Sequence, residues 1–144
     1  MSVVGALNDG WGWTGIKAAK VHDQSPMGHL IFASSEGCFY YLDVDGMRIE
    51  TLGTADAVQA HFATREAQEL WSGGALVDAA RNRFGELPEG HVFNLEPLAL
   101  LQGQYEADQM CVLPLEDLIR FTGDAARQLK DLSDGAQFQV KVVD

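Results

Sequence analysis

Residues 114–132 carry the sequence PLEDLIRFTGDAARQLKDL, in which apolar side chains return every three or four positions. That spacing is the period of an α-helix with one face buried in a protein core. Pro114 suits the first turn of a helix, because the N–H that proline lacks has no helical partner there. The sequence therefore predicts a long helix near the C-terminus, with an apolar stripe formed by Leu115, Leu118, Ile119, Thr122, Ala125, Ala126, Leu129 and Leu132.

One glycine, Gly123, interrupts the middle of this helix. A glycine inside a helix costs about 1 kcal/mol relative to alanine. We therefore expect either a close packing contact or a local bend at this position.

The first third of the chain has the pattern of a β-meander. Short runs of alternating side chains are separated by turns rich in glycine and aspartate, which predicts strands at 16–22, 29–33, 37–43 and 47–52. Between the last two runs, Asp45-Gly46 indicates a tight hairpin, because both central residues of a type I′ turn need positive φ.

From Thr54 onward the apolar period becomes helical. Thr54, Thr64 and Ser72 are candidate caps for three short helices, the last of which stops at Gly85. Further strands are expected at 91–95, 98–101, 110–113 and 136–143. The sequence thus predicts one α+β domain over residues 1–144, an antiparallel meander sheet with several helices, the longest packed on the sheet near the C-terminus.

The charge of the chain is strongly negative, with 21 acidic residues, 10 basic residues and a net charge of -11. This excess argues against direct binding of nucleic acid or of anionic membranes. No apolar run approaches the roughly 18 residues of a membrane helix, and residues 3–7 are too short for a signal peptide. With Cys38 and Cys111 interpreted as free thiols, we expect a cytoplasmic location.

Residues 10–15, GWGWTG, match the spacing of a dinucleotide-binding loop, and Glu36 lies where that motif places an acid. A full helix should follow such a loop, yet Ser25-Pro26 ends any helix soon afterwards. We interpret the glycines as turns around structural Trp11 and Trp13, and we expect no cofactor.

Metal and catalytic motifs are also incomplete. Asp43-x-Asp45-Gly46 resembles part of a calcium loop, but Tyr41 and Leu52 occupy two positions where ligands are needed. The histidines lack the spacing of zinc ligands and are interpreted as lone surface or boundary residues: His22, His29, His61 and His91. The sequence therefore predicts no catalytic, cofactor-binding or metal-binding residues, and a protein that is not an enzyme.

Several stretches carry a family resemblance: WGWTG at 11–15, GCFY at 37–40, PLEDLIRFTGD at 114–124 and KDLSDGA at 130–136. Together they resemble a bacterial domain family of unknown function that is similar to the carboxy-terminal domain of type VI secretion immunity proteins. Those proteins neutralise a DNase effector. The resemblance spans nearly the whole chain and implies the same fold and an immunity function, without implying any catalytic residue.

Charge and resemblance together favour an acidic binding protein, an immunity-type antagonist that docks on a basic nuclease effector. A nuclease cleft must be positive to hold phosphates, so carboxylates on an antagonist speed association with it. Acids near turns are the candidate contacts, because turns project from the fold: Glu36, Asp43, Asp45, Glu86, Glu89 and Asp108.

Two alternatives remain open. One is a stand-alone scaffold or regulatory module that binds an unrelated protein. The other is a small enzyme, which needs a deep pocket with converging carboxylates. The oligomeric state does not follow from the sequence.

Overall fold

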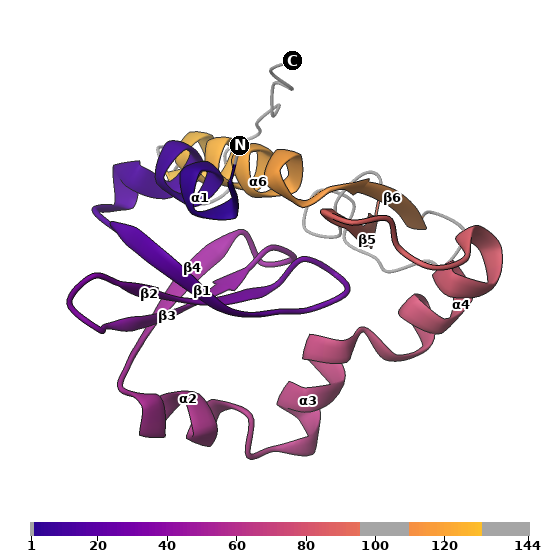
Figure 1. The fold of residues 1–144 in the computed structure, drawn as a ribbon, viewed down its shortest axis with the longest axis horizontal. Helices are drawn as coiled ribbons and strands as arrows, with labels where there is room; N and C mark the ends of the chain where they lie inside the picture. Colours follow the sequence, from indigo (N-terminus) through magenta and orange to yellow (C-terminus); the bar gives the residue numbers. More distant parts are fainter. Residues whose placement is uncertain (1, 96–109, 131–144) are drawn as a thin grey trace.

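A four-stranded antiparallel sheet lies between two layers of helices in the computed structural model, which describes residues 2–95 and 110–130 (Figure 1). The strands follow one another in the order β1-β2-β3-β4, so the predicted α+β fold with a meander sheet is confirmed. Their bounds are β1 (Ala18–Gln24), β2 (Leu30–Ser34), β3 (Phe39–Asp43) and β4 (Arg48–Gly53).

Alternation along the strands divides the sheet into two faces. Leu30 pairs with Leu42 and Phe32 pairs with Tyr40, so these side chains share one face. The β3–β4 hairpin exists, but the predicted two-residue turn is wrong. Asp43 pairs with Arg48, which leaves a four-residue connection, and the positive φ of 51° falls on Met47.

The first helix, α1 (Val3–Trp11), was not predicted from the sequence. Ser2 caps it by accepting a hydrogen bond from the backbone N–H of Gly5 at 3.0 Å. A short 3-10 turn, η1 (Gly12–Thr14), follows directly. The glycines of the apparent dinucleotide motif therefore lie at the end of a helix, not between a strand and a helix.

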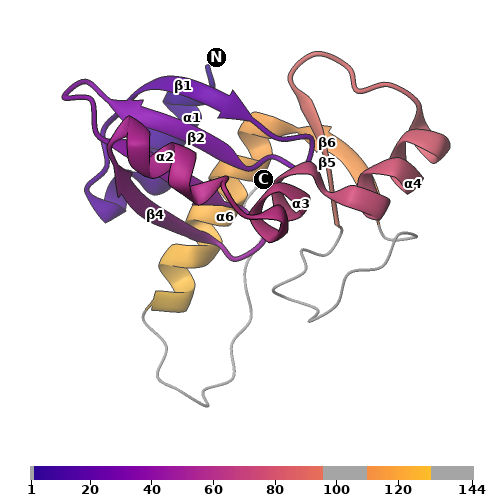
Figure 2. The same ribbon diagram turned by 90° about the horizontal axis from the view of Figure 1, so that it is seen from below.

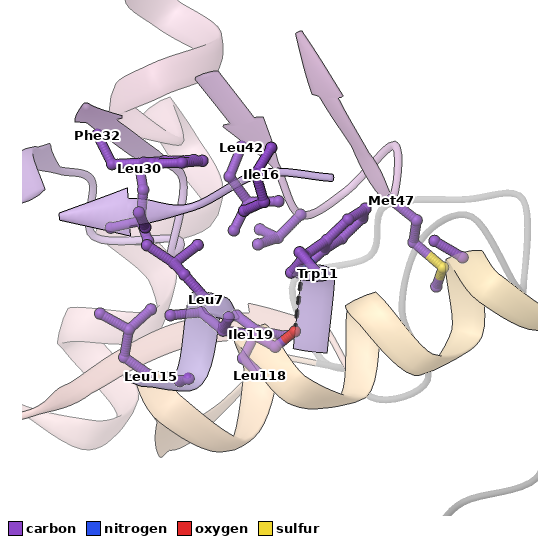
Figure 3. Close-up of a cluster of buried hydrophobic side chains, with 14 of the residues drawn as sticks. Leu7, Trp11, Ile16, Leu30, Phe32, Leu42, Met47, Leu115, Leu118 and Ile119 are labelled. Atoms are coloured by element: carbon purple, nitrogen blue, oxygen red, sulfur yellow. Dashed lines mark hydrogen bonds between the residues drawn. The ribbon is translucent and has the colours of Figure 1, made fainter. Parts of the chain in front are cut away.

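The long helix α6 (Leu115–Lys130) packs on the sheet, as predicted, and also on α1 (Figure 3). Trp11 is buried between them, and its indole Nε1 donates to the carbonyl oxygen of Ile119 at 3.1 Å. Trp13 donates in the same way to Gly123 at 3.1 Å. The two rings stack with centroids 6.1 Å apart, and both donate to the same helix.

Glycines allow α1 and α6 to touch through their backbones. A Cβ on Gly10 would lie 3.0 Å from the Cα of Arg120, and a Cβ on Gly123 would overlap the carbonyl group of Gly10. The packing reason expected for Gly123 is thus confirmed.

Residues 54–90 form what we call the helical arm, which contains α2 (Ala55–His61), α3 (Arg65–Ser72) and α4 (Gly74–Phe84). Thr54 and Thr64 cap the first two helices as predicted. The third helix is capped by Gly73, whose φ is 79°, and not by Ser72. Figures 1 and 2 show α2 and α3 on the side of the sheet opposite α1 and α6.

A two-stranded ribbon, β5 (His91–Leu95) and β6 (Met110–Pro114), leads into α6. The predicted strands at 98–101 and 136–143, the candidate contact Asp108 and the helix end at Leu132 lie outside the described residues. Cys38 and Cys111 are not joined in a disulfide. Within residues 2–95 and 110–130, no helix has the length and apolar character needed to cross a membrane.

Candidate functional site

Three polar side chains meet inside the protein, on the sheet face that carries α2 and α3. We call them the His29 cluster: His29, Asp43 and Asp45. The pairing of Leu30 with Leu42 brings them together, because it puts His29, just before β2, opposite Asp43 at the end of β3. The expectation that His29 is a lone surface or boundary residue is therefore wrong, since its exposed fraction is 0%.

Hydrogen bonds fix the backbone on both sides of the cluster. The Ser25 hydroxyl accepts from the backbone N–H groups of Met27 at 3.2 Å and His29 at 3.0 Å, which holds the turn before β2. Asp43 Oδ1 accepts from the N–H of Gly46 at 3.0 Å, which holds the turn after β3.

The imidazole of His29 lies between two carboxylates. Its Nε2 is 3.3 Å from Asp45 Oδ2, and its Nδ1 is 3.6 Å from Asp43 Oδ1. Neither nitrogen makes a hydrogen bond with a described residue, although both are fully buried. A buried polar atom without a hydrogen bond costs folding free energy, so the burial of these two nitrogens requires an explanation.

Aromatic rings and one amide enclose the cluster. The ring of Tyr41 stacks over His29 at 6.0 Å, and Trp71 of α3 lies 6.3 Å away. From β5, Asn94 Nδ2 donates to the carbonyl oxygen of Met27 at 2.7 Å and to Asp45 Oδ1 at 3.5 Å. The cluster thus joins the sheet, the helical arm and the β5–β6 ribbon.

The carboxylates affect the tyrosine beside them. Burial, followed by the negative charges of Asp43 and Asp45, raises the pKa of Tyr41 far above its ordinary value. Tyr41 is consequently a neutral phenol at any ordinary pH.

The predicted contact residues separate into two groups. Glu36, Glu86 and Glu89 are exposed, as a contact role requires. Asp43 and Asp45 are buried, at 8% and 7% exposure, which contradicts the expectation that they project from a turn. Their connection folds inward because the carboxylates turn toward His29.

The three exposed candidates do not form one patch. Glu36 lies in the β2–β3 turn, whereas Glu86 and Glu89 follow α4. These two segments lie at opposite ends of the molecule in Figure 1. A single docking surface therefore does not include all of them.

An open hollow of about 500 Å³ lies beside η1 and the end of α6. Trp13 and Tyr40 contribute to its walls together with Arg48 and Lys130, and Lys130 lies over the Trp13 ring at 4.9 Å. Among the described residues, its lining contains no carboxylate, so they do not provide the converging acids on which the enzyme alternative depends.

No protein-family model matches this chain, and no curated protein matches its sequence. The candidate sites accordingly rest on the geometry of their own residues.

The His29 cluster was not predicted, because His29 and the two carboxylates belong to different segments of the chain and lack the close spacing of a ligand motif. One signal was present. The predicted strands 29–33 and 37–43, paired as a hairpin, already place His29 beside Asp43.

Proposed function

We propose that this chain is a non-enzymatic, acidic binding protein that docks on a basic protein partner through its helical arm. One observation carries the proposal: Leu70 and Phe84, both on the arm, are large apolar side chains with exposed fractions of 51% and 41%. Apolar side chains surrounded by polar ones are typical of protein interfaces.

The charges around these side chains favour a basic partner. Glu66 precedes Leu70 by one helical turn, and Glu86 follows Phe84 closely. The arm carries six acids, Asp56, Glu66, Glu69, Asp78, Glu86 and Glu89, against three arginines, Arg65, Arg81 and Arg83. Together with the net charge of -11, this excess steers a positive surface toward the arm.

The class of partner that we propose is a nuclease effector. A nuclease groove must be basic to hold phosphates, so an acidic protein bound there excludes the nucleic acid. The resemblance to a domain of type VI secretion immunity proteins supports the same class. The protein acts in the cytoplasm in this proposal, where such an effector would reach nucleic acid.

In the first step of the test, the untagged chain serves as bait, and mass spectrometry identifies the protein that binds to it. The association rate constant is then measured between about 50 and 500 mM salt, over which the Debye length falls from about 14 to about 4 Å. We expect a basic partner and a steep fall in the association rate. An acidic partner, or an association rate independent of salt, contradicts the proposal.

Two variants locate the interface. Glu66→Lys/Leu70→Ala on the arm should slow association and speed dissociation, whereas Glu36→Lys in the β2–β3 turn, outside the arm, should do neither. Equal loss in both variants contradicts docking through the arm. Stoichiometric inhibition of the partner's nuclease activity supports immunity, while a basic partner without that activity supports the scaffold or regulatory module instead.

A further inference from the structure

We propose that His29, Asp43 and Asp45 bind one divalent transition-metal ion, for which Zn²⁺ is the best match. This inference is independent of the docking proposal. Each residue offers one ligand atom, and these atoms lie within 4.8 Å of one another. Imidazole nitrogen and carboxylate oxygen are both ordinary zinc ligands.

The distance between His29 and Asp45 fits two ligands of one ion. Metal–ligand bonds of roughly 2.0–2.2 Å at tetrahedral angles place ligand atoms roughly 3.3 Å apart. His29 Nε2 and Asp45 Oδ2 are 3.3 Å apart. These two atoms therefore already have the separation that a bound ion requires. Asp43 Oδ1 lies 3.6 Å from the other ring nitrogen, Nδ1, so Asp43 joins the ion by turning its carboxylate toward the Nε2 side.

The direction from which the Asp45 carboxylate approaches His29 Nε2 favours a shared metal ion over a hydrogen bond. At 3.3 Å a hydrogen bond is within reach, yet His29 Nε2 makes none with Asp45. The carboxylate oxygen of Asp45 thus lies off the axis along which an N–H would point. Around a tetrahedral ion, the second ligand also lies off the axis between the first ligand and the metal.

The charges agree with a cation. Two carboxylates lie at the cluster, with 12% and 7% of their side-chain surfaces exposed. Arg48 Nε approaches Asp43 Oδ2 at 3.5 Å from the solvent side, with 70% of its own side chain exposed. A divalent ion offsets the remaining negative charge, and buried charges need such compensation.

Neighbouring groups orient the ligands. Asn94 donates to Asp45 Oδ1, which leaves Oδ2 for the ion, and the N–H of Gly46 holds Asp43 Oδ1. Such outer contacts are typical of metal sites. A bound ion ties the start of β2 to the end of β3 and its turn, because its three ligands come from these segments.

The test uses the untagged full chain, stripped with a chelator, and Zn²⁺ alone. Calorimetric titration should give one ion per chain with Kd in the micromolar range or tighter, and Zn²⁺ should raise Tm. Asp45→Asn, which keeps the side-chain shape, should weaken binding at least about tenfold, as loss of a ligand exceeds loss of an outer contact. His22→Ala, at an exposed histidine on β1, should leave binding unchanged.

Two results overturn the proposal. The first is no saturable Zn²⁺ binding below about 100 μM, which leaves His29 in an ion pair with the carboxylates. The second is equal weakening by Asp45→Asn and His22→Ala, which marks binding at surface histidines. If Asp45→Asn fails to fold, Co²⁺ added to the unaltered chain decides: tetrahedral absorption bands support the site, and the spectrum of aqueous Co²⁺ contradicts it.

Discussion

Gly123 of α6 lies directly against the carbonyl group of Gly10 in α1, with no room for a Cβ atom on Gly123. The two helices meet backbone to backbone at this crossing. Trp11 and Trp13 add hydrogen bonds to α6 carbonyl groups on the same side. The helix crossing thus depends on two glycines, which have no side chain, as well as on the two tryptophan indoles.

Gly123→Ala should destabilise the protein by about 1 to 3 kcal/mol, because its methyl group would collide with backbone atoms that cannot rotate away. Urea unfolding measures the loss. Gly12→Ala is the matched control: Gly12 has a helical φ of -59° and no atom within 4 Å of an added Cβ, so its effect should stay within about 0.5 kcal/mol. Equal effects would show that the helices do not touch at Gly123.

Leu118→Ala should cost about 2 to 5 kcal/mol, because Leu118 is 1% exposed and its loss leaves a cavity beneath the sheet. Leu70→Ala removes the same atoms from an exposed helix position and should change the unfolding free energy by less than about 0.5 kcal/mol. Chemical denaturation of both variants provides the comparison. A loss below about 0.5 kcal/mol for Leu118→Ala would contradict the buried stripe.

Tyr40 should make the fold sensitive to alkali. A hydrogen bond with the Cys38 side chain, followed by burial, raises the pKa of Tyr40 above its ordinary value of 10.0. The contribution to stability is complete below pH 10 and is lost as the pH rises toward the folded pKa, because the unfolded chain releases the proton first. Tyr40→Phe should therefore flatten the fall in Tm above pH 10. An unchanged pH profile would argue against the raised pKa.

The chain should bind neither NAD nor ATP. The glycines at positions 10, 12 and 15 lie at the end of α1 and in η1, where Gly10 is occupied by its contact with α6. A phosphate-binding loop instead needs a free helix N-terminus after the last glycine. Calorimetric titration should give no binding heat, and a micromolar Kd for either nucleotide would refute this interpretation.

The meander and α6 were predictable because their signals are local. Alternation around Leu30 and Leu42 and the stripe from Leu115 onward each repeat with the period of one element. The sequence did not reveal α1, because the glycines near its end are poor helix formers on their own. Its stability comes from α6, more than 100 residues further along the chain, and from burial of Trp11.

The candidate site was harder to predict from the sequence, for a related reason. His29 and Asp45 come from different segments, and only the strand register brings them together. The turn pattern at Asp45 indicated a projecting hairpin tip, and nothing local signals that its carboxylate turns inward. The exposure of Leu70 and Phe84 was likewise not predictable, because amphipathic spacing does not tell which helix faces the tertiary structure covers.

The hydrogen bond from Trp11 to Ile119 spans 108 positions in the chain. On a translating ribosome, the four strands of the meander therefore emerge well before α6, which covers the apolar face containing Leu30 and Phe32. That face stays open until α6 has been synthesised, an interval in which chaperones or neighbouring nascent chains can reach it. A truncation that ends before α6 should accordingly aggregate, and folding of the whole chain should be slow for its size because its decisive contacts are so distant.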